Sequence, residues 1–212
     1  MKSWLVTSFI IVGLVATQNS FAIGDAAKEL QHEWDAAKYQ TPNKAREKQF
    51  KHLAEMAKNT QELHPNDAEV LVWEAIILSS YAGEKGGLGA LSLVKQAKGL
   101  LEQAEKIDAT VLDGSVYTSL GSLYYQVPGW PLGFGDGDKA EVYLKKALSI
   151  APNDIDANFF YGDFLFEESD YGQAIQVLKK ALNAPARPGR EIADTGRKEE
   201  IKQLLAKAQK KL

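Results

Sequence analysis

The chain has 212 residues, a formal net charge of −3 and no cysteine. The absence of cysteine excludes disulfides, thiol catalysis and cysteine metal sites, and without a basic block there is no electrostatic case for binding nucleic acid or anionic lipid. The length is enough for one sizeable core or a row of smaller stacked units.

Residues 1–22 have the organisation of a secretory signal peptide. Lys2 supplies a positive start, an apolar stretch runs from Trp4 to Ala16, and Ser20-Phe21-Ala22 is a small-x-small cleavage site. A retained anchor is the alternative, but a membrane-spanning helix needs about 20 apolar residues. We therefore predict cleavage after Ala22, a mature domain over 23–212 with no membrane insertion, and a periplasmic location.

Residues 25–64 predict two amphipathic helices. The first carries Ala27, Leu30, Trp34 and Ala37 along one side. Because a stack of helical units exposes apolar faces at its ends, we expect this segment to act as a terminal cap.

Residues 68–186 contain the same helix-hairpin pattern three times, over about 68–111, 114–154 and 155–186. Small residues at regular spacing let two helices approach closely. In the last two copies, the second helix carries an alanine, a leucine four residues later and another alanine three residues after that. A proline then ends the middle copy. The repeat positions are Gly121, Tyr124, Ala140, Leu144, Ala147 and Pro152 in the middle copy, and Gly162, Ala174, Leu178 and Ala181 in the last.

This pattern resembles the tetratricopeptide repeat (TPR) family, whose repeats of about 34 residues carry a similar order of glycine, tyrosine, alanine and proline. The resemblance implies an all-α fold, a right-handed superhelical stack of antiparallel helix hairpins with about three repeats. A last helix over 194–212, starting at Asp194-Thr195, is expected to be the second cap. Arg187 to Arg190 is predicted to be an exposed linker before it.

Two of the repeats contain insertions between their helices. In the last copy, the repeat glycine and the next repeat alanine, Gly162 and Ala174, are 12 residues apart. The corresponding distance is 19 residues from Gly121 to Ala140. It is 22 residues from Ala75, which takes the place of the glycine in the first copy, to Ala97. Insertions of this kind share one edge of the stack and are often the binding surface. The earlier one, Tyr81 to Lys95, is rich in glycine and is predicted to be a flexible loop.

The later insertion, from Val127 to Asp138, is the leading candidate for a partner-binding element. Prolines stiffen it, and Trp130 and Phe134 lie on it without any helical reason to be there. A rigid loop that presents aromatic residues limits the entropy lost on binding. The alternatives are that both rings fold back as a lid over the core of their own hairpin, or that the loop combines the two roles. Asp136 and Asp138, at the end of this insertion, are included in the same candidate. Their spacing resembles the start of a calcium loop, but the remaining acidic ligands are misplaced, so we expect a turn.

The inner face of the stack is a second candidate. Asn158 and Asp163 lie on or near the first helix of the last copy, where related scaffolds hold extended peptides. The alternative is that such polar residues are simply solvated.

No residue set for catalysis, metal or cofactor binding emerges. The three histidines, His32, His52 and His64, lack metal-ligand spacing, and no Gly-x-Ser-x-Gly elbow is present. We therefore predict a protein that is not an enzyme, with no cofactor and no metal.

The expected partner is another exported protein or peptide, bound by the helical stack and its loop edge, and homo-oligomerisation stays open. Gly133-Phe134-Gly135-Asp136 ahead of Ala140 resembles the glycine-rich loop of the T component of TRAP transporters. That resemblance implies a transporter substrate-binding protein as the partner. The alternative function is small-molecule binding, in a pocket under the Trp130 loop.

Overall fold

The computed structural model describes residues 24–212, and over this range it contains helices and no strand. The predicted signal peptide lies outside the described residues. None of the described helices combines the length and the apolar character that crossing a bilayer requires.

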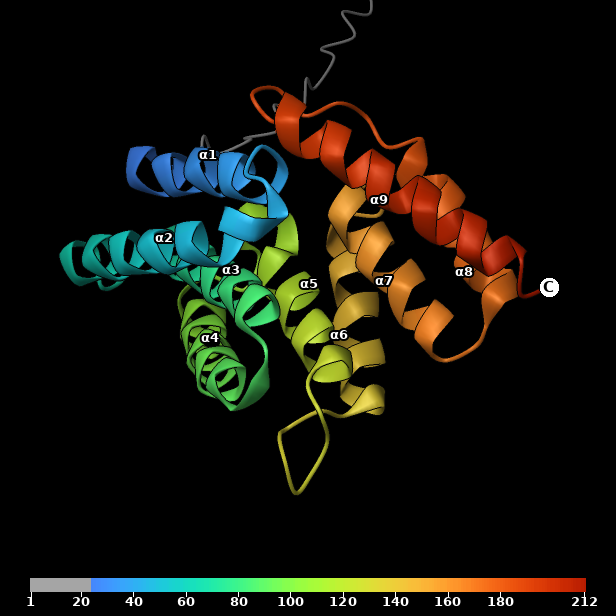
Figure 1. Ribbon diagram of the computed structural model, residues 1–212, viewed down its shortest axis with the longest axis horizontal. Coiled ribbons are helices and arrows are strands. Elements are labelled where there is room, and N and C mark those ends of the chain that lie inside the picture. Colours follow the sequence, from blue (N-terminus) through green and yellow to red (C-terminus); the bar gives the residue numbers. More distant parts are fainter. Residues whose placement is uncertain (1–23) are drawn as a thin grey trace, which may run out of the picture.

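The helices pair into antiparallel hairpins that stack side by side (Figure 1). The odd-numbered helices contact one another along one side of the stack, and each even-numbered helix packs against its own partner and the next odd-numbered helix. This arrangement confirms the predicted all-helical solenoid. The bounds are α1 (Asp25–Tyr39), α2 (Asn43–Leu63), α3 (Ala68–Lys85), α4 (Gly87–Ile107), α5 (Val111–Gln126), α6 (Gly137–Ile150), α7 (Ile155–Glu167), α8 (Tyr171–Leu182) and α9 (Glu191–Gln209).

Aspartates set the starts of four helices. The carboxylates of Asp67, Asp136, Asp154 and Asp170 accept hydrogen bonds from backbone N–H groups in the first turns of α3, α6, α7 and α8. Those N–H groups have no partner inside the helix, so a capping side chain stabilises each start by about 1 kcal/mol.

The small repeat residues lie where the two helices of a hairpin touch. Gly121 on α5 faces Leu144 on α6, and Gly162 on α7 faces Leu178 on α8. The alanines on the second helices are completely buried at these contacts: Ala140, Ala147, Ala174 and Ala181.

Two sequence predictions about elements were wrong. Tyr81–Lys95 is not a flexible loop, because α3 continues to Lys85 and α4 begins at Gly87. The ten extra residues therefore lengthen two helices, and Gly86 and Gly87, both with positive φ, make the sharp turn between them. The last helix begins at Glu191, before the expected start, and the Asp194 side chain is directed to Arg187 instead of capping the helix.

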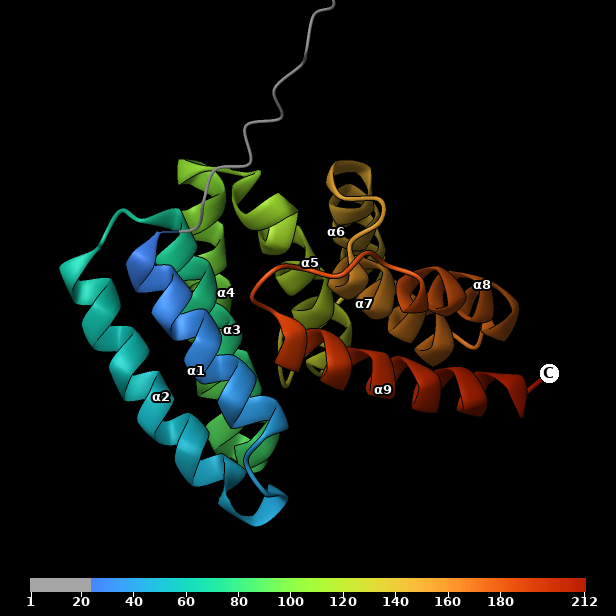
Figure 2. The same cartoon turned by 90° about the horizontal axis from the view of Figure 1, so that it is seen from above.

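The first and last helices contact each other, so the curved stack closes on itself. Figure 1 and Figure 2 show the segment between α8 and α9 running across toward α1, so that α9 begins near the end of α1. The C-terminal cap therefore contacts both ends of the stack, α1 on one side and α7 and α8 on the other.

Candidate partner-binding surface

The segment 127–136, which we call the 127–136 loop, forms a closed projection between α5 and α6. Its base is joined by the Gly135 N–H donating to the Pro128 carbonyl at 3.0 Å and the Asp136 N–H donating to the Tyr124 carbonyl at 2.8 Å. At the tip, the N–H groups of Leu132 and Gly133 both donate to the Gly129 carbonyl at 3.1 Å. These hydrogen bonds fix the backbone of the loop.

Two glycines allow this closure. A side chain at Gly135 would overlap the Val127 carbonyl oxygen, and one at Gly133 would overlap the Pro128 carbonyl oxygen. At Gly129, by contrast, an added Cβ would lie 3.4 Å from the nearest atom, a tight contact but one without overlap. The close approach of the two loop strands therefore requires glycine at positions 133 and 135 but not at position 129.

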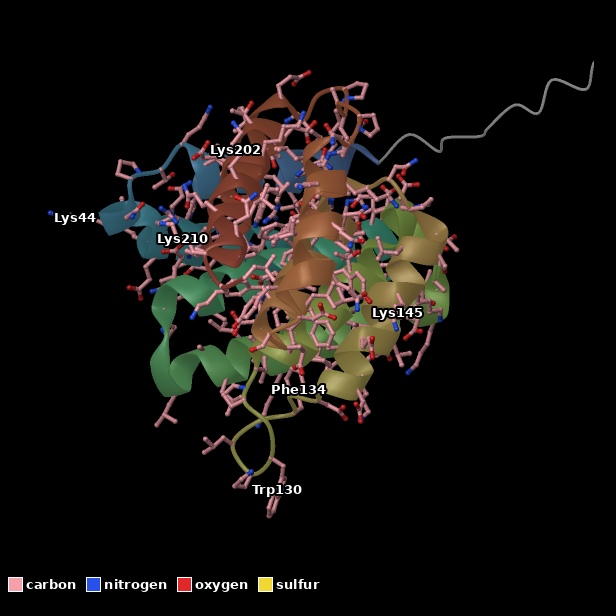
Figure 3. The ribbon with its side chains drawn as sticks, turned by 90° about the vertical axis from the view of Figure 1, so that its right-hand side faces the viewer. Lys44, Trp130, Phe134, Lys145, Lys202 and Lys210 are labelled. Atoms are coloured by element: carbon pink, nitrogen blue, oxygen red, sulfur yellow. The ribbon has the colours of Figure 1, made fainter. Side chains whose placement is uncertain are left out.

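The two aromatic residues of the loop have different roles. Trp130 is 90% exposed at the tip, beside Leu132 at 67%. Phe134 lies at the base, where its ring packs edge-on against Tyr124 at 5.7 Å and the Lys98 ammonium lies 5.8 Å from its centre. Figure 3 shows Trp130 pointing away from the helices and Phe134 close to them. Phe134 thus anchors the loop, and Trp130 is the residue left available.

The space beneath the loop is filled by the protein itself. Phe134 belongs to the core around Tyr124 and also packs against the core around Val127, and Leu91 from α4 packs beside them. Two surface hollows that the described residues line, one beside Asp67 and one beside Glu168, include neither Trp130 nor Phe134. The structure therefore gives no support to a small-molecule pocket under the Trp130 loop.

An acidic hollow lies next to the loop. It has a volume of about 430 Å³ and is lined by four carboxylates and one ammonium group, with the rings of Tyr161 and Phe164 between them. Asp136 caps α6 behind it, and the Lys139 backbone N–H holds the pKa of Asp136 below its ordinary value. The charged lining residues are Asp138, Glu141, Lys145, Glu168 and Asp170.

The inner-face candidates are engaged inside the molecule. The Asn158 amide is buried and donates to the carbonyls of Pro152 and Asp154 at 2.9 and 2.7 Å. Asp163 accepts a 2.6 Å hydrogen bond from the Tyr125 hydroxyl, and burial raises the pKa of Asp163. Asn158 therefore secures the start of α7, and we leave it out of the proposed contact surface.

Three arginines near the start of α9 contact residues of α1, α3 and α7. Arg190 forms a bidentate hydrogen bond with Asp35 of α1, 3.0 Å at both nitrogens, and its guanidinium lies 5.3 Å from the Trp73 ring centre. Both partners are buried. Removal of one partner from a buried pair leaves an uncompensated charge, which costs about 3–5 kcal/mol, so this pair ties α9 to α1.

Arg187 and Arg197 converge on Asp156 of α7, each donating at 2.7 Å to a different carboxylate oxygen. Burial opposes ionisation of Asp156, but the two guanidinium groups outweigh it and hold its pKa below the ordinary value. Arg197 also lies over the ring of Phe159, at 4.3 Å. The carboxylates of the inner face near the start of α9 are thus held in ion pairs within the chain.

Sequence reasoning missed this network. Arg187 to Arg190 was predicted to be an exposed linker, whereas Arg190 is buried and Arg187 is half-buried between α7 and α9. The two arginines of this segment, which follow Asp154 and Asp156 by one helix hairpin, were the signal that could have indicated the ion pairs with α7. The pairing of Arg190 with Asp35 joins residues far apart in the chain and has no local sequence pattern.

Comparisons with known proteins agree with the repeat pattern. Residues 132–194 match the model of the tetratricopeptide repeat family. No curated protein matches the chain. Among solved structures, a thermophilic TPR protein of Thermus thermophilus aligns over 82% of this chain and 99% of its own, with 14% identity and a TM-score of 0.41. The segment from the 127–136 loop to the start of α9 therefore resembles a tetratricopeptide repeat in its sequence.

Proposed function

We propose that this protein is an exported adaptor that binds another protein through the 127–136 loop. The observation that carries the proposal is Trp130, a large ring left 90% exposed on a loop whose backbone is fixed by its own hydrogen bonds. Rigid aromatic residues dominate binding energy because little entropy is lost when they are buried.

The ion pairs on the inner face support the same choice of surface. The buried Asp35–Arg190 pair and the contacts of Asp156 occupy the side where helical-repeat scaffolds hold extended peptides. The loop edge, where Trp130 is exposed, is therefore the surface that we propose for the partner. On this proposal the protein is a scaffold and not an enzyme.

The finer proposal is a periplasmic location, with a transporter substrate-binding protein as the partner. It rests on the charge and apolar order of residues 1–22 and on the Gly133-Phe134-Gly135-Asp136 resemblance. Cell fractionation with intact-mass measurement tests the export step. A chain beginning at Ile23 in the periplasm supports it, and an uncut chain in the cytoplasm contradicts it.

The binding proposal is tested by photo-crosslinking from the loop in living cells. With p-benzoylphenylalanine in place of Leu132, Trp130 stays intact and a bound partner is captured at the tip. We expect one dominant protein adduct that disappears when Trp130→Ala is added. The same probe at Lys210, on the C-terminal side of α9, is the control. Equal capture from both positions, or capture that does not need Trp130, would contradict the proposal.

A further inference from the structure

Exposed apolar residues and carboxylates lie together on one edge of the stack, the edge formed by the turns inside the hairpins. Trp130 projects from it (Figure 3), and Leu132 is also exposed. Leu88 is 90% exposed near the start of α4, and Leu91, three residues later, lies close to Gly133 of the loop. Exposed apolar groups gathered in this way mark an interaction surface.

The acidic hollow continues this edge directly after the loop. Gly137 and Asp138 line it at the start of α6, and Glu168 comes from the end of α7, with its carboxylate close to Gly137. Lys145 is already paired with Glu141 at 2.7 Å. Among the described residues, Asp138 and Glu168 form no ion pair, and both are exposed beside the base of the 127–136 loop.

We propose that this edge docks a protein whose surface has an apolar socket bordered by lysine or arginine side chains. The socket receives Trp130 and Leu132, and the basic border faces Asp138 and Glu168. This inference rests on the proposed adaptor function and specifies the chemistry of its partner. Buried aromatic anchors supply affinity at the centre of an interface, and complementary charges at the rim steer association and exclude wrong partners.

The same charges argue against a lipid surface as the occupant. A tryptophan–leucine tip is also suited to a bilayer interface. Here, however, the neighbouring carboxylates would be repelled by anionic headgroups or would lose hydration close to the membrane. The acidic hollow beside the base of the loop therefore favours a basic protein surface.

The test uses the protein captured at Leu132, purified and titrated against the mature chain. Asp138→Asn combined with Glu168→Gln is expected to weaken binding about fivefold at low salt, since each exposed charge pair contributes modestly. The loss is expected to shrink at about 0.5 M NaCl, where such charges are screened. Glu29→Gln with Glu33→Gln, on the exposed side of α1, is the matched control and is expected to leave affinity unchanged.

Each contrary result has a distinct meaning. If capture requires Trp130 but the affinity depends neither on salt nor on the Asp138 and Glu168 substitutions, the proposed basic border is wrong and the adaptor function is retained. Absence of any capture from position 132 overturns both. Sedimentation of the wild-type chain, but not Trp130→Ala, with phosphatidylcholine vesicles would identify a lipid surface as the occupant and overturn the proposed partner.

Discussion

At the scale of single residues, the hairpins depend on glycines that lie against leucines. A Cβ on Gly121 would lie 2.6 Å from Leu144 Cγ and 3.2 Å from the Leu144 backbone nitrogen. Leu144 is completely buried, so its side chain has no free space into which it can shift. Close packing of two backbones, and not flexibility, is what this position requires.

We predict that Gly121→Ala destabilises the protein by about 1 kcal/mol. Alanine gains up to about 1 kcal/mol of helix propensity over glycine, but forced overpacking costs about 1–3 kcal/mol. Gly99 on α4 is the matched control, since nothing lies within 4 Å of its added Cβ, and Gly99→Ala should stabilise. Urea unfolding measures both changes, and equal stabilisation by the two substitutions would refute the packing argument.

Glu74 on α3 makes stability depend on pH. The residue is buried, one of its carboxylate oxygens has no hydrogen-bond partner among the described residues, and burial raises the pKa of Glu74 to about 7. The unfolded chain ionises this group near 4.5. Between these values the folded protein holds a proton that the unfolded chain releases, so this contribution to stability is lost as pH rises.

We predict that Glu74→Gln removes this loss. The variant should match the wild type below about pH 4.5 and exceed it by about 2 kcal/mol above pH 8, from the conversion of 1.36 kcal/mol per pKa unit with allowance for partial hydration. The measurement is the free energy of unfolding at several pH values. A difference between the two proteins that stays constant from pH 4 to pH 8 would show that Glu74 does not titrate in this way.

At the scale of elements, the 127–136 loop is the part whose role sequence reasoning left open. Its prolines, glycines and aromatic residues predicted a rigid presenting loop, but no local pattern separates an anchoring ring from an exposed one. That distinction depends on Tyr124 and Lys98, which belong to other helices and meet Phe134 only in the folded protein.

The loop geometry makes a prediction with a matched pair of glycines. Gly135→Ala should reduce partner capture from position 132 by about tenfold, because overlap with the Val127 carbonyl displaces the tip and affinity depends on preorganisation. Gly129→Ala, whose Cβ would avoid overlap, should retain most of the capture. Circular dichroism should show unchanged helix in both. Equal capture by the two variants would mean that the loop backbone does not position Trp130.

At the scale of the whole molecule, the sequence predicted the stack but not its closure. Helical spacing and small residues are local signals, so the hairpins around Gly121 and Gly162 were accessible to reasoning from sequence. The Asp35–Arg190 pair joins residues far apart in the chain, and no periodic pattern reports such a contact. The closure joins α1 to α9 and engages the carboxylates between them, whereas Trp130 at the loop edge stays exposed.

The most direct test of binding at the loop edge is to fix the contact between α1 and α9 covalently and then measure partner capture. Lys38 and Glu200 pair across α1 and α9 at 3.5 Å, and the sequence has no other thiol when both are changed to cysteine. With Lys38→Cys and Glu200→Cys bridged by a short bismaleimide, we expect crosslinking from position 132 to capture the partner as efficiently as in the unbridged chain. Loss of capture on bridging would show that the inner groove must open, and would contradict binding through the loop edge of a closed stack.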